Sequence, residues 1–136
     1  MMKKLLLVCC IAFAALAVCS SCSSDKDGTH EYLINMGRSH VTDKQAYNKI
    51  MEYIGQDPYF SSRPQYTGKF TECTERAIEE FKEHCNRLDS EYICSLLTDP
   101  VTDVFVIDFW SCDPMQNWIS TVFRPDFVEI KDGDAD

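Results

Sequence analysis

The chain has 136 residues, of which 13 are lysine or arginine, 22 are aspartate or glutamate and 8 are cysteine. That length suits a single domain with one modest hydrophobic core. A net charge of −9 argues against a nucleic-acid partner, because binding to phosphates needs a basic surface. Anionic lipid headgroups would also repel such a surface, so we expect any membrane attachment to be covalent or hydrophobic.

Residues 1–21 have the organisation of a secretory signal peptide. Lys3 and Lys4 form a basic start, and an uninterrupted apolar run of 14 residues follows from Leu5 to Val18. This run is too short to span a membrane as a helix. A buried core helix would need neither the two leading lysines nor the polar end that follows, so we expect this segment to be removed.

The end of this segment resembles the processing site of bacterial lipoprotein precursors of the Bacteroidetes type. In such precursors a peptidase cuts directly before a cysteine, which then carries acyl chains such as palmitate. Ser21 before Cys22 is small, as that peptidase requires, whereas Val18 before the competing Cys19 is bulky. Cleavage at Cys22 also leaves four further cysteines, an even number that suits an oxidising compartment. The resemblance therefore implies lipidation at Cys22 and attachment to the outer membrane of the cell envelope.

Residues 22–40 are predicted to be the lipid anchor and a flexible tether, because they begin with a polar stretch and contain glycine. The stretch after Cys22 reads SSDKDG and is similar to the surface-export signal of those lipoproteins. An ordinary solvated N-terminus explains the same composition, so surface exposure and a periplasmic orientation are both left open. The folded domain is expected at 41–131, before an acidic tail at 132–136.

Two amphipathic helices are predicted in the first half of the domain. The first is expected to run from Asp43 to Ile54 and to end in a left-handed conformation at Gly55. Thr42 and Gln45 are expected to form a capping box at its start. The second helix is expected from Glu72 to Leu88. Each helix has one apolar stripe, which predicts packing against a core, and the glutamates of the second helix fit a solvated face.

Residues 56–69 have the composition of a loop, with two prolines and one glycine. Tyr59 and Phe60 are unusual residues for an exposed loop. They fit either a lid folded over the core or a small binding surface.

The last third of the domain is predicted to be an antiparallel meander. The segments Val104–Trp110 and Trp118–Arg124 are dense in β-branched and aromatic residues, which predicts a hairpin. Its register is expected to place Trp110 opposite Trp118, with one face of the hairpin in the core. Apolar residues of the other face are expected to stay partly exposed and to form a candidate interaction surface with the loop aromatics: Trp110, Trp118, Val106, Val122, Tyr59 and Phe60.

Two flanking segments complete the predicted sheet. Glu91–Leu97 fits either a short helix or a first strand, and its β-rich start favours the strand. Phe127–Lys131 is expected to add an edge strand. The predicted fold class is therefore α+β, with two helices packed on a three- or four-stranded antiparallel meander. In plan this arrangement resembles small envelope lipoproteins and the helix–sheet modules of β-lactamase inhibitor proteins.

Four cysteines lie in the predicted domain, and their spacing matches neither a zinc site nor a redox motif. In an oxidising compartment we expect two disulfides, which would stabilise so small a domain. Cys73 and Cys85 lie too far apart on one helix to be bridged. The favoured pairs are Cys73–Cys94 and Cys85–Cys112, and the pairs Cys85–Cys94 and Cys73–Cys112 are the alternative.

Residues with catalytic chemistry are sparse. The three histidines have no ligand spacing, and no nucleophile, phosphate-binding or dinucleotide-binding motif occurs. His84 is expected to be a partly buried structural residue. Asp108 stands alone in an apolar strand, where a hydrogen bond to Ser120 across the hairpin is the simplest role. We therefore predict no catalytic residue, no metal site and no cofactor.

These features predict a non-catalytic lipoprotein of the cell envelope that binds another protein or an envelope component. The alternative is a small inhibitor or immunity-type lipoprotein, which would place its acidic surface against a basic secreted or envelope enzyme. In both cases the membrane contact is the covalent lipid, and no nucleic-acid partner is expected.

Overall fold

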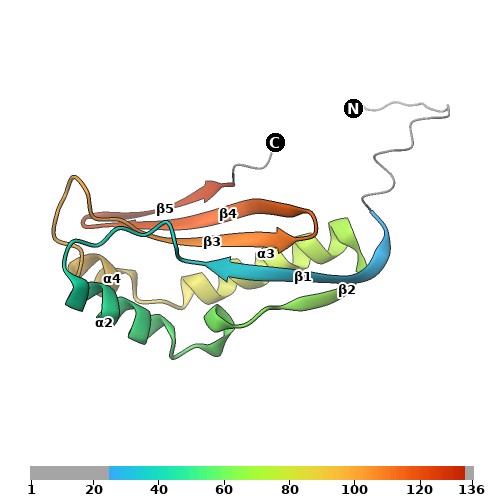
Figure 1. The fold of residues 1–136 in the computed structure, drawn as a ribbon, viewed down its shortest axis with the longest axis horizontal. Helices are drawn as coiled ribbons and strands as arrows, with labels where there is room; N and C mark the ends of the chain where they lie inside the picture. The colour runs from blue at the N-terminus through green and yellow to red at the C-terminus, as the bar shows by residue number, and fades with distance from the viewer. Residues whose placement is uncertain (1–24, 134–136) are drawn as a thin grey trace.

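The computed structural model describes residues 25–133, so the predicted signal peptide, the predicted lipidation site Cys22 and residues 134–136 lie outside the described part. Five strands form one sheet in the order β2-β1-β3-β4-β5, and every neighbouring pair is antiparallel. Figure 1 shows this sheet as one layer, with the helices forming a second layer along one side. No helix of the described residues is long and apolar enough to cross a bilayer. In chain order the elements are β1 (Asp27–Asn35), α2 (Lys44–Ile54), the 3₁₀ helix η2 (Pro58–Ser61), β2 (Gln65–Lys69), α3 (Phe70–Asn86), α4 (Ser90–Ser95), β3 (Phe105–Cys112), β4 (Met115–Arg124) and β5 (Phe127–Asp132).

The predicted α+β arrangement with an antiparallel meander is present in β3, β4 and β5, but the predicted fold is wrong in three details. The sheet has five strands instead of three or four, and three α-helices rather than two accompany it within residues 25–133. The predicted disulfides are absent, because all four cysteines of the described part are free thiols. Packing of apolar side chains between the two layers therefore stabilises this domain without disulfide bonds among the described residues.

The segment predicted as a flexible tether contains β1, which lies inside the sheet. The first half of β1 pairs with β2 and the second half with β3, so this strand joins the two parts of the sheet. Tyr32, at the changeover, is fully buried, and its hydroxyl lies 3.0 Å from the hydroxyl of Thr74 on α3. The folded domain therefore includes the residues from about 25 onward and does not begin at 41.

The chain is fixed to the fold as early as Asp25. Its carboxylate accepts a hydrogen bond from the backbone N–H of Thr71 at 2.8 Å, in the first turn of α3. A negative charge at this position also complements the positive end of the helix dipole. The chain just before β1 and the start of α3 are thereby held together.

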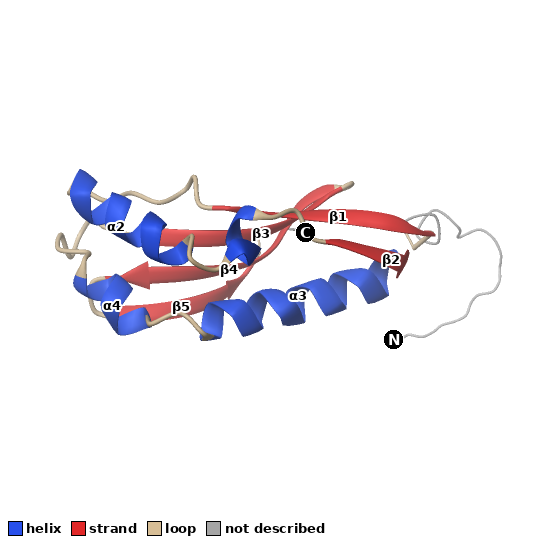
Figure 2. Ribbon diagram, turned by 90° about the horizontal axis from the view of Figure 1, so that it is seen from below, coloured by secondary structure: helices blue, strands red, loops and turns tan. Residues whose placement is uncertain are grey.

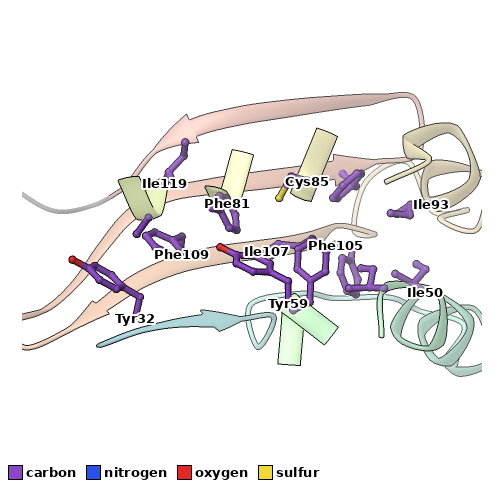
Figure 3. Packing of buried hydrophobic residues seen from close by; sticks show 14 of the residues in the cluster. Tyr32, Ile50, Tyr59, Phe81, Cys85, Ile93, Phe105, Ile107, Phe109 and Ile119 are labelled. Atoms are coloured by element: carbon purple, nitrogen blue, oxygen red, sulfur yellow. The ribbon is translucent and has the colours of Figure 1, made fainter. Parts of the chain in front are cut away.

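The predicted loop of residues 56–69 is only in part irregular. Pro58–Ser61 forms η2, and Gln65–Lys69 forms the edge strand β2. Tyr59 and Phe60 of η2 are buried, and Figure 3 shows Tyr59 among the core residues. Of the two interpretations of these aromatics, the lid over the core is confirmed and the binding surface is wrong.

α2 forms where the sequence predicts it, but both of its predicted ends need correction. Asp43 caps the helix, since its carboxylate accepts the N–H of Gln45 at 2.9 Å. The predicted capping box is absent because the hydroxyl of Thr42 donates to Asp103 at 2.7 Å instead. Gly55 ends the helix in the right-handed region, at a φ of −66°, and not in the left-handed one.

α3 forms where a helix is predicted, with both ends two residues earlier and its apolar stripe against the sheet, whereas α4 replaces a predicted strand. Asp89 caps α4 by accepting the N–H of Tyr92 at 3.2 Å, and Ile93 is fully buried. A helix of six residues is too short for its periodicity to separate it from a strand in the sequence.

β3 and β4 form the predicted hairpin, but its register is irregular. A bulge shifts the pairing so that Trp110 lies opposite Asn117, and Trp118 is the extra residue. Trp118 turns to the side covered by the helices, where its ring lies 6.2 Å from the ring of Phe70. The two tryptophans therefore belong to opposite faces of the sheet.

The hydrophobic core lies between the sheet and the helix layer. Figure 3 shows aromatic and aliphatic side chains of β3 facing those of α3 and α2. The predicted edge strand is present as β5, whose six residues are all exposed. The core is built mainly from Tyr32, Ile50, Ile54, Phe60, Phe81, Ile93, Phe105, Ile107, Phe109 and Phe123.

Candidate functional site

The helices cover the side of the sheet that is toward the viewer in Figure 2. The opposite side, called the open face below, is covered by no helix of the described part (Figure 1). On this face, the residues that pair on neighbouring strands line up in rows across the sheet. Val106, Asp108 and Val122 are buried although no helix lies over them. The longest row runs from β1 through β3 and β4 to β5 and consists of Asn35, Asp108, Ser120 and Lys131.

Asp108 is the polar centre of the open face and is fully buried. Arg38 holds it with two parallel hydrogen bonds, from Nε to Oδ2 at 2.8 Å and from Nη2 to Oδ1 at 2.7 Å. The hydroxyl of Ser120 also donates to Oδ1. Two-point pairs of this kind are stronger and more directional than single hydrogen bonds. The predicted bond between Asp108 and Ser120 is confirmed, and Arg38 adds a partner that the sequence did not predict.

An irregular stretch after β1 directs Arg38 over the open face. The hydroxyl of Ser39 accepts the N–H of Val106 at 2.9 Å and donates to the carbonyl of the same residue at 3.3 Å. His40 then resumes backbone pairing with Val104, through hydrogen bonds of 2.7 and 2.8 Å. A side chain thus replaces one backbone partner in the ladder, and the chain between the two pairings bulges toward the open face.

A hollow of about 280 Å³ opens beside the pair of Arg38 and Asp108. Its floor is apolar and consists of valines from β3 and β4, whereas basic side chains border it. Amide and hydroxyl groups of β4 add polar hydrogen-bonding atoms. The hollow is lined by Arg38, Val104, Val106, Asn117, Ser120, Val122, Arg124, Lys131 and Asp132.

The hollow gathers positive charge in a chain whose net charge is −9. Arg38 is paired with the buried carboxylate of Asp108. Arg124 and Lys131 form no ion pair with any carboxylate of residues 25–133. Asp132 is the one acid in the lining of the hollow. The electrostatics of the hollow therefore favour an anionic group.

The polar groups around Asp108 are engaged with one another by hydrogen bonds. Both oxygens of Asp108 accept hydrogen bonds from Arg38, and Ser120 donates to the same carboxylate. The lining contains no histidine. No group of three or more metal-ligating side chains occurs in the part of the chain that the structure describes.

The predicted interaction surface does not exist as one patch. Trp110 lies half-buried on the open face, whereas Trp118 lies on the helix side, where its Nε1 donates to Ser111 Oγ at 2.9 Å. Val106 and Val122 are buried in the floor of the hollow, and the two aromatics of η2 are core residues. The physical reason is the bulge, because one extra residue in a strand reverses the side to which its neighbour points.

Three residues that border the hollow were missed in the sequence: Arg38, Arg124 and Lys131. The strand alternation could have found Arg124, which follows Val122 by two residues and so shares its face. Lys131 shares a row with Ser120 only through the register of β4 and β5. Arg38 has no local signal, since it lies 70 residues from its partner in the chain.

His84 lies in the helix layer, apart from the hollow. Its ring stacks on Tyr59 with centroids 4.0 Å apart, and its Nδ1 lies 2.6 Å from Oδ2 of Asp57. Burial alone would raise the pKa of Asp57, but hydrogen bonds from His84 and from the N–H of Tyr59 outweigh it and lower that pKa. The prediction of a partly buried structural histidine is confirmed.

The four cysteines of the described part are unpaired, so the predicted pairs Cys73–Cys94 and Cys85–Cys112 are wrong. Cys73 and Cys85 are buried on α3, while Cys94 and Cys112 are partly exposed. Burial raises the pKa of Cys85 to about 12, and it also raises the pKa of Cys94 and of Cys112. None of these three thiols is therefore activated as a nucleophile.

The disulfide prediction failed because it assumed a strand at residues 91–97. That segment contains α4, which places Cys94 beside the start of β5, with its thiol 3.8 Å from the carbonyl oxygen of Phe127. Cys112 lies at the end of β3, and its sulfur is 3.4 Å from Arg63. Without disulfides, the even number of cysteines no longer argues for Cys22 as the lipidated residue, and the small Ser21 before it remains the argument.

A second, larger groove of about 680 Å³ runs along α3. Four of its eight lining residues are glutamates and two are basic, and the guanidinium of Arg76 lies over the ring of Tyr66 at 5.3 Å from the centroid. These acids are the glutamates predicted as a solvated helix face. The lining consists of Tyr66, Glu75, Arg76, Glu79, Glu80, Lys82, Glu83 and Asn86.

The chain matches no known protein family, no curated protein and no solved structure. Among the sites described above, the hollow combines buried valines with two cations, Arg124 and Lys131, that form no ion pair with the described residues, and this combination suits an anionic ligand.

Proposed function

We propose that this protein is a non-catalytic binding module of the cell envelope, which receives an anionic group of another protein or of an envelope component in the hollow. The observation that carries the proposal is the charge of the hollow. Arg124 and Lys131 border it without an acidic ion-pair partner in the described residues, in a chain with a net charge of −9. The signal peptide and the Ser21–Cys22 sequence support a lipid on Cys22 that attaches the module to the outer membrane.

Charge and shape both suit a ligand of this kind. A guanidinium beside an ammonium group binds carboxylate, phosphate or sulfate oxygens through charge-assisted hydrogen bonds. The buried valines of the floor, Val106 and Val122, keep water from one side of such a group, which strengthens those bonds. A volume of about 280 Å³ admits a side chain or a headgroup rather than a large cofactor.

The remainder of the surface adds selectivity to this arrangement. Most of the charged groups of the chain are acidic, so its net charge of −9 repels an anionic partner at long range, whereas the cations of the hollow attract it locally. Such a charge distribution guides the orientation of the partner as well as its affinity. The bonds around Asp108 support the non-catalytic part of the proposal, since its carboxylate is saturated by Arg38 and Ser120.

The test compares what the lipid-anchored protein and two charge-reversal variants capture from detergent-solubilised envelopes. Arg124→Glu places a carboxylate at the hollow. Arg87→Glu makes the same change of charge directly after the end of α3, where the side chain is exposed and lies 3.9 Å from Glu83. We expect a specific component to be retained by the wild type and by Arg87→Glu, and to be reduced about tenfold or more by Arg124→Glu. Equal capture by all three proteins would contradict the proposal.

The alternative function, a small inhibitor or immunity-type lipoprotein, is favoured by the groove along α3. Its glutamates give it a negative charge that suits a basic enzyme. The same experiment separates the two functions. This alternative requires that a basic protein is still captured by Arg124→Glu and is lost with Glu79→Lys, a change in the lining of the groove.

A further inference from the structure

We propose that β5 is the contact between two copies of this protein, which pair their β5 strands antiparallel and so join their two sheets into one. β5 is an edge strand with no partner beyond it in the described residues, and all six of its residues are exposed. Three of them are apolar: Phe127 is 47%, Val128 38% and Ile130 50% exposed. An exposed apolar edge strand is a template for pairing with another strand.

The backbone of β5 presents its outward groups at three positions. Gly133, directly after β5, donates its N–H to the carbonyl of Trp118 at 2.9 Å. Because backbone groups alternate between the two sides of a strand, the odd-numbered residues of β5 direct theirs toward β4. The N–H and C=O groups of Val128, Ile130 and Asp132 therefore point away from the sheet, where a second β5 can accept and donate hydrogen bonds.

The side-chain charges of β5 select one register for this pairing. In a symmetric contact between identical strands, one residue lies opposite its own copy. With Ile130 in that position, Glu129 lies opposite the partner's Lys131, and the same pair forms a second time by symmetry. A centre at residue 129 or 131 would instead place like charges against each other. The register centred on Ile130 therefore gives two ion pairs on the open face and an isoleucine contact on the helix side.

The other edge of the sheet lacks these features. The exposed residues of β2 are Gln65, Thr67 and Lys69, all of them polar. The one large apolar side chain of β2, Tyr66, is partly buried already, and a lysine on an edge strand opposes such pairing unless an acid faces it. The described sheet thus has one edge that is suited to a second copy of the chain.

This contact goes beyond the proposed function and shares Lys131 with it. In the dimer Lys131 pairs with Glu129 of the second copy, and Arg124 is then the cation of the hollow that forms no ion pair with the described residues. The two proposals are tested through different residues. Arg124 lies on β4 and takes no part in the register of the two β5 strands. Failure of the capture experiment therefore leaves the β5 contact standing, and failure of the β5 contact leaves the hollow standing.

Charge reversal tests the register in the full chain, by sedimentation equilibrium in density-matched mild detergent. Glu129→Lys and Lys131→Glu each replace attraction by repulsion in both symmetric pairs, so each is expected to raise the dissociation constant of the dimer about tenfold or more. The double variant Glu129→Lys/Lys131→Glu restores opposite charges and is expected to recover the wild-type constant within about threefold. A monomeric wild type, or a double variant as weak as the single ones, would overturn the proposal.

A cysteine at the centre of the contact gives an independent measurement in intact cells. Ile130→Cys places two thiols opposite each other, with Cα atoms about 5.5 Å apart, which a disulfide can bridge. Val101→Cys, at a residue that is 82% exposed in the turn before β3, is the control for random collisions. Under mild oxidation we expect dimers of Ile130→Cys to form about tenfold faster than those of Val101→Cys. Equal rates, or cross-links from position 130 to a different protein, would show that β5 does not pair with its own copy.

Discussion

Replacement of Asp103 by asparagine is expected to destabilise the fold, because the buried carboxylate ties the start of α2 to the turn that leads into β3. Asp103 is fully buried. Its oxygens accept hydrogen bonds from the N–H and the hydroxyl of Thr42, at 2.9 and 2.7 Å. They also accept the backbone N–H groups of Thr98 and Asp99, at 3.0 and 3.2 Å. An asparagine cannot accept all four bonds, and it turns its own N–H groups toward donors.

The magnitude follows from the pKa of Asp103. Burial would raise this pKa, but the hydrogen bonds from Thr42, Asp99 and Thr98 outweigh it and lower the pKa from 3.8 to about 2. The ionised carboxylate therefore contributes about 2.5 kcal/mol to the free energy of unfolding at neutral pH. Because the folded-state pKa is the lower one, this stabilisation is present above pH 3.8 and is lost as the pH falls toward 2. About half of it remains at pH 3.

Urea denaturation of the wild type and of Asp103→Asn at pH 7 and at pH 3 measures this contribution. We expect the free energies of unfolding of the two proteins to differ by about 2–3 kcal/mol at pH 7 and by about 1 kcal/mol at pH 3. Glu52→Gln, at an exposed carboxylate on α2, is the control and should change stability little at either pH. A difference between wild type and Asp103→Asn that is the same at both pH values would refute the role of ionisation.

Two further predictions concern the bulge and the anchor. Trp118→Ala is expected to lower the free energy of unfolding by about 3 kcal/mol, because it removes the contact with Phe70 and the hydrogen bond to Ser111. A melting temperature close to that of the wild type would show that Trp118 is not part of the core. Labelling with a fatty-acid analogue is expected to modify the wild type and Cys19→Ala but not Cys22→Ala, and lipid on the Cys22→Ala protein would rule out the proposed anchor.

Local periodicity explains which elements could be predicted. α2, α3 and the hairpin of β3 and β4 each repeat an apolar pattern over enough residues to fix the type of element. β1 and β2 were missed because their pattern is mostly polar, and because they form only by pairing with distant segments. Thr29 of β1, for example, pairs with Thr67, 38 residues later in the chain. Whether the segment of α4 becomes a helix or a strand depends on the burial of Ile93 in the core, and the local sequence does not show that burial.

In the candidate site, too, the features set by local sequence were predictable and those set by distant contacts were not. The bond between Asp108 and Ser120 was predictable because both residues belong to one hairpin, whose alternation places them on the same face. The position of Trp118 was not, because a bulge inserts a single residue without changing the composition of the strand. Arg38 reaches Asp108 only after β1 has docked in the sheet, so its role depends on tertiary structure.

The hydrogen bond between Asp25 and Thr71 limits how far the domain can stand off from a bilayer. On the proposed anchor, three residue steps separate Cys22 from Asp25, a span of roughly 11 Å at most. The end of the domain where β1 and α3 begin would then stay close to the headgroups, and α2 and α4 lie at the opposite end (Figure 1). A single copy could rotate about that end while staying close to the membrane. Two copies joined through antiparallel β5 strands would carry their lipids at opposite ends, and the pair would have to lie flat on the membrane.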